Sequence, residues 1–95
     1  MSKKDAYAEK LKAQIDEWNA EIDKLEAKIK KSSADAQVKY EDQLKEVRGK
    51  RDELKSSLDE IQKAGESTWE DLKKNADEVW KSTKKRIEEI QSELA

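Results

Sequence analysis

The sequence contains no cysteine, no histidine and no proline, and it has only two glycines among 95 residues. Without cysteine the chain forms neither a disulfide bond nor a thiolate metal site, and without histidine it lacks the commonest general base and transition-metal ligand. Because a β-sandwich or barrel needs turns at short intervals, the scarcity of proline and glycine excludes those folds. We therefore predict a protein that is not an enzyme and that binds no metal, cofactor or small-molecule substrate.

Long hydrophobic runs are also missing. No stretch approaches the ~18 consecutive apolar residues that span a membrane, and the first residues lead into no apolar segment typical of a secretory signal. The motifs for lipid anchors do not occur either. From these observations we expect a cytoplasmic protein.

Charged residues dominate instead and make up 46% of the chain. The 21 basic and 23 acidic residues nearly cancel, and they are interspersed, which argues against nucleic-acid binding. Alanine, glutamate, lysine, leucine and arginine together account for about half of the residues, a share typical of long helices and coiled coils. The composition therefore predicts an all-α fold, with residues 1–95 forming a single helical coiled-coil unit.

The apolar residues of the first two thirds follow alternating steps of four and three, as in the a/d seam of a coiled coil. We call these residues the interaction seam: Leu11, Ile15, Trp18, Ile22, Leu25, Ile29, Leu44, Val47, Leu54, Leu58 and Ile61. Arg51 stands at a seam position that calls for an apolar residue. We interpret its long stem as lying along the seam while the guanidinium reaches water, although such a residue can also set register or partner.

Residues 67–94 have the cleanest amphipathic pattern. Their apolar positions fall on one helical stripe of about 100°, and all charged residues lie outside it. This second-helix stripe consists of Trp69, Leu72, Val79, Trp80, Ile87, Ile90 and Leu94. Because the segment has no excess of lysine and arginine, we favour core or partner contacts for its tryptophans over a lipid surface.

The strongest signal for a helix break lies at Gly65. A glycine suits a left-handed residue after a helix, and Ser67 with Glu70 matches the capping-box pattern of a helix start. We therefore predict a long helix over residues 3–64 and an amphipathic second helix over 67–94 that folds back as a coiled-coil hairpin. Two alternatives remain open: a further turn at Ser32 and Ser33 would give a three-helix bundle, and no turn at Gly65 would give a single long helix.

In the predicted hairpin, the seam between Leu11 and Ile29 is left uncovered and requires a second chain. We therefore expect a homo-oligomer or a complex with another helical protein. The function that this favours is that of a structural or scaffold coiled coil, mediating self-association or helix-mediated partner binding. The alternatives are an amphipathic lipid-surface binder acting through residues 67–95, and a hydrophilic stress-type protein that is largely disordered on its own.

Two parts of the sequence carry a resemblance to known proteins. They are the N-terminal segments at residues 4–7, 10–18 and 20–25, which include Trp18, and the segment at residues 69–73, which begins with Trp69. Both are similar to short bacterial coiled-coil-domain proteins of unknown function. The resemblance implies a helical, coiled-coil protein, and it implies no activity, cofactor or site residue.

Overall fold

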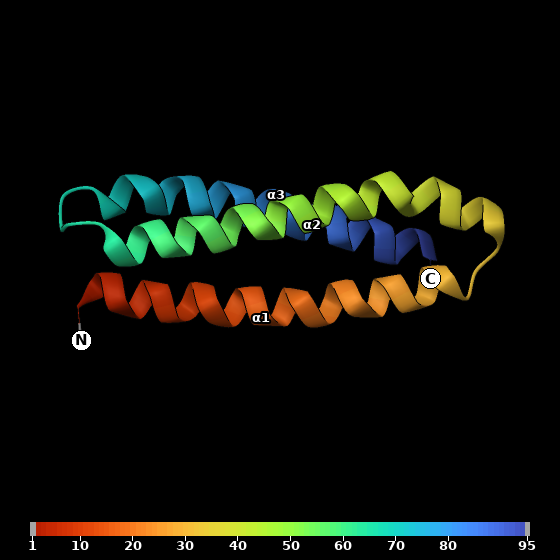
Figure 1. The fold of residues 1–95 in the computed structure, drawn as a ribbon, viewed down its shortest axis with the longest axis horizontal. Coiled ribbons are helices and arrows are strands. Elements are labelled where there is room, and N and C mark those ends of the chain that lie inside the picture. The colour runs from red at the N-terminus through yellow and green to blue at the C-terminus, as the bar shows by residue number, and fades with distance from the viewer. Residues whose placement is uncertain (1, 95) are drawn as a thin grey trace.

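The computed structural model describes residues 2–94, which form three α-helices: α1 (Lys3–Lys30), α2 (Ala34–Lys63) and α3 (Trp69–Leu94). The helices run up, down and up along one axis, so that α1 and α3 are parallel and α2 is antiparallel to both (Figure 1). The bundle measures 49 × 19 × 18 Å, and α2 packs against both of its neighbours. The all-α prediction is confirmed, and the chain adopts the three-helix alternative.

The predicted two-helix hairpin with one helix over residues 3–64 is wrong, because the chain also turns between Lys30 and Ala34. The backbone N–H of Lys31 bonds the Ala27 carbonyl, and Ser33 starts the next helix by accepting a hydrogen bond on Oγ from the Ala36 N–H at 3.3 Å. The turn interrupts only a few helical hydrogen bonds, each with a net value of about 1 kcal/mol. It allows α2 to cover the seam of α1, where each buried leucine or isoleucine contributes about 1.5–3 kcal/mol.

The break near Gly65 is in the predicted place but has another construction. Gly65 does not take a positive φ, and its carbonyl accepts hydrogen bonds from the N–H groups of Thr68 at 3.2 Å and Trp69 at 3.3 Å. The Thr68 carbonyl in turn accepts from the Leu72 N–H, so α3 begins at Trp69 and not at Ser67. The predicted left-handed glycine is wrong because Gly65 has no positive φ, and the predicted Ser67 cap is wrong because α3 begins two residues later.

The core is one continuous cluster drawn from all three helices. The interaction seam is buried throughout, except that Leu58 is half-buried. Of the second-helix stripe, Trp69, Ile87 and Ile90 are buried, while Leu72, Val79, Trp80 and Leu94 are half-buried and pack against the cluster. The seam segment that was expected to need a second chain is therefore covered by the chain itself.

Candidate functional site

Two aromatic pairs join the parallel helices α1 and α3. The ring of Tyr7 lies 6.1 Å from that of Trp69, and the rings of Trp18 and Trp80 are stacked at 5.8 Å with an angle of 11° between their planes. In each helix the two aromatic residues are eleven positions apart, which is three turns of helix and keeps both on one face. This equal spacing was a signal in the sequence for a parallel pair of helices that the seam analysis missed.

The end of the bundle near the α2–α3 turn is fixed by polar contacts. The Tyr7 hydroxyl donates to Asp77 Oδ1 at 2.7 Å, and Lys4 Nζ donates to the Ala64 carbonyl at 2.9 Å. Burial of the phenol and its hydrogen bond to the Asp77 carboxylate raise the pKa of Tyr7 well above its usual value. Tyr7 therefore acts as a neutral hydrogen-bond donor that holds α3 against α1.

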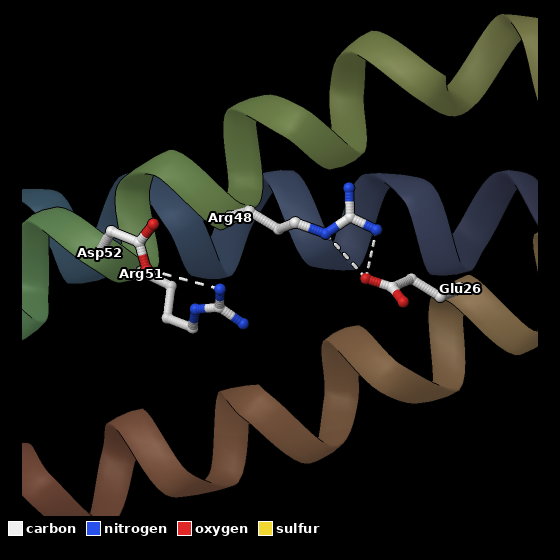
Figure 2. A network of polar contacts seen from close by, with 4 residues as sticks. All are labelled: Glu26, Arg48, Arg51 and Asp52. Carbon is white, nitrogen blue, oxygen red and sulfur yellow. Dashed lines mark hydrogen bonds and ion pairs between the residues drawn. The ribbon is translucent and has the colours of Figure 1, made fainter.

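Each pair of helices also has a polar bridge between side chains. Arg48 Nε donates to Glu26 Oε1 at 2.8 Å, and the second guanidinium contact to the same oxygen makes this the closest ion pair between helices (Figure 2). Because the three bridges join three different pairs of helices, together they favour one order and orientation of the bundle. The bridges are Glu26 with Arg48 between α1 and α2, Glu46 with Arg86 between α2 and α3, and Glu21 with Gln91 between α1 and α3.

Arg51 lies one turn from Arg48 on the same helix (Figure 2). Its side chain is 21% exposed, and one terminal nitrogen lies 3.4 Å from Asp52 Oδ1. The stem thus occupies the seam while the head reaches a neighbouring carboxylate at the surface. Its Nε atom is buried and has no hydrogen-bond partner among the residues that the structure describes.

A hollow of about 390 Å³ opens between α1 and α2 near the turn that joins them. Its lining includes the buried residues Ile29 and Leu44, the charged residues Lys30 and Glu41, and Val38. Val38 is 73% exposed, and no other large hydrophobic residue within residues 2–94 is classed as exposed. Sequence analysis missed Val38 because it falls outside the heptad positions.

Within the described range, no group of three or more acidic side chains is placed to hold a metal ion. None of α1, α2 and α3 is apolar over a length that would cross a bilayer. No protein-family model, curated protein or solved structure matches the chain.

Proposed function

We propose that the protein is a structural, non-catalytic helical bundle that acts through protein–protein contact and associates with a second copy of itself. The observation that carries this proposal is the position of Val38, which is exposed on the edge of a hollow whose lining is largely apolar. Exposed apolar surface next to a concavity is typical of an interaction site. The residues of the interaction seam and of the second-helix stripe pack within the bundle, either in the core cluster or against it.

We expect a second copy to suit this surface, because the surface offers both an exposed apolar side chain and charges of both signs. In a twofold arrangement the same patch serves on both subunits, so each Val38 would enter the hollow over Ile29 and Leu44 of the other copy. The lining of the hollow also carries two bases, Lys30 and Arg48, and two acids, Glu26 and Glu41, and of these Arg48 and Glu26 pair with each other within the chain. A twofold arrangement that sets each Lys30 against Glu41 of the other copy would favour the pairing of like chains.

Sedimentation velocity over a range of micromolar to millimolar concentration tests the proposal. We expect the parent protein to shift toward a dimer as concentration rises, and Val38→Glu to abolish the shift because it places a charge against an apolar hollow. Ala20→Glu is the matched control, since Ala20 is exposed on α1 and lies outside the hollow. A parent protein that stays monomeric throughout, or equal dimerisation of both variants, would contradict the proposal.

The bundle gives less support to the other functions considered from the sequence. The tryptophans of α3 that would enter a lipid surface pack against α1, so lipid binding would require the bundle to open. An ordered core drawn from three helices is also unlike a chain that is disordered on its own. We place the structural role in the cytoplasm, and we expect anionic vesicles to leave the helicity and the tryptophan emission unchanged.

A further inference from the structure

Three buried polar atoms have no hydrogen-bond partner within residues 2–94: Asn19 Oδ1, Arg51 Nε and Trp80 Nε1. Each comes from a different helix. Buried polar atoms in proteins almost always have a partner, either in the protein or in ordered water. Three such atoms in a bundle of this size therefore call for a common explanation.

The packing places the three residues at about the same level along the bundle axis. Asn19 directly follows Trp18, whose ring is stacked on that of Trp80, so α1 and α3 bring these two residues to the same height. Arg51 is bracketed by two contacts between the antiparallel helices α1 and α2, namely Lys4 with the Ala64 carbonyl and Glu26 with Arg48. These contacts place Arg51 opposite the segment of α1 between residues 17 and 23, which contains Asn19.

The three atoms also match the bonding capacity of water. The arginine Nε–H and the indole Nε1–H are donors, and the asparagine Oδ1 is an acceptor. A water molecule can accept two hydrogen bonds and donate to a third partner, which is the usual number for buried water. An anion would be repelled by the partial negative charge on Asn19 Oδ1, and a cation would be repelled by the guanidinium of Arg51.

We propose that the middle of the bundle contains an internal water site, in which water bonds Trp80 Nε1, Arg51 Nε and Asn19 Oδ1. The site makes the seam position of Arg51 part of a polar layer that joins all three helices. Because every helix contributes one group, the layer favours this register of the bundle over shifted ones. The proposal concerns the single chain and does not depend on self-association.

Dipolar cross-relaxation between water and protein, measured by NMR in the rotating frame, tests the site. The indole signal of Trp80 is assigned by its loss in Trp80→Phe. We expect this indole proton to show a water cross-peak with the sign of a dipolar contact, and the cross-peak to be lost in Asn19→Leu/Arg51→Met. Arg48→Met is the matched control, because it removes an arginine one turn away from the layer and should retain the cross-peak.

The buried Thr83 hydroxyl, which donates to the Val79 carbonyl at 2.7 Å, is a second source of exchanging protons near Trp80. The cross-peak should therefore persist in Thr83→Val. Its absence in the parent protein, its survival in Asn19→Leu/Arg51→Met, or its loss in Thr83→Val would each overturn the proposal. If circular dichroism shows that the double variant is unfolded, the spectra of the parent protein and of Thr83→Val alone decide whether the internal water site exists.

Discussion

The indole rings of Trp18 and Trp80 are stacked 5.8 Å apart across the interface of α1 and α3. In a hairpin with one continuous helix over residues 3–64, Trp80 would lie near residue 50, about 50 Å from Trp18 at 1.5 Å per residue. The stacking therefore exists only because the chain turns twice. It is the contact that most clearly separates the three-helix bundle from the two-helix prediction.

Leucine substitutions at the two tryptophans should reveal this contact in a double-mutant cycle. We expect Trp18→Leu and Trp80→Leu to be coupled by about 0.5–1.5 kcal/mol, the value typical of aromatic pairs in contact. Urea denaturation of the parent, both single variants and the double variant gives the coupling. Trp18→Leu with Trp69→Leu is the control cycle, since these residues belong to different aromatic pairs and should act additively. Additive effects in the first cycle would contradict the stacking.

The first turn predicts a difference between two serines. Ser33→Ala should lower the free energy of unfolding by about 0.5–2 kcal/mol, because it removes the side chain that accepts from the Ala36 N–H. Ser67→Ala is the control and should have an effect near zero, since Ser67 is exposed and does not begin α3. Thermal unfolding followed by circular dichroism measures both. The opposite order of the two effects would show that the helix starts are assigned wrongly.

At the second turn, Gly65→Ala should stabilise the protein. Gly65 has no positive φ, and an added Cβ would meet only Thr68 Oγ1 at an ordinary contact distance of 4.0 Å. Alanine reduces the freedom of the unfolded chain, which is worth about 0.4–1 kcal/mol where the native backbone accepts it. The expected readout is a higher melting temperature. A lower one would restore the left-handed glycine that the sequence suggested.

The pairing of Tyr7 with Asp77 predicts a dependence on alkaline pH. Because burial and the hydrogen bond raise the pKa of Tyr7 in the folded chain, the unfolded chain loses the phenolic proton at lower pH. The free energy of unfolding contributed by Tyr7 is then complete at neutral pH and falls as the pH rises above about 10.

Tyr7→Phe tests this relationship. The variant should be less stable than the parent by about 1–2 kcal/mol at neutral pH, because it removes the hydrogen bond to the carboxylate. The difference between the two proteins should shrink above about pH 10, where only the parent loses the phenolic contribution. Urea denaturation at neutral and alkaline pH measures both values. A difference that stays constant over this range would contradict the role given to the hydroxyl.

The sequence predicts which residues are buried better than it predicts where the chain turns between helices. Periodicity placed Ile22, Leu25 and Val47 in the core, because a repeat of apolar residues reports directly on the buried face of a helix. The turn at Ser33 was only an alternative, since it has neither glycine nor a capping box and is stabilised by the distant burial of the α1 seam. Val38 was missed for a different reason, because a surface site has no period.

The distance between residues 12 and 74 tests the three-helix bundle most directly. The chain has no cysteine, so Lys12 and Lys74, both exposed, can each be replaced by a spin-labelled cysteine. The two positions share the register of Trp18 and Trp80 across a bundle 19 × 18 Å in section. In labelled protein diluted with unlabelled chain, double electron–electron resonance should give a distance between the two spin labels below about 30 Å. A distance of about 65 Å, which a two-helix hairpin would give at 1.5 Å per helical residue, would contradict the three-helix bundle.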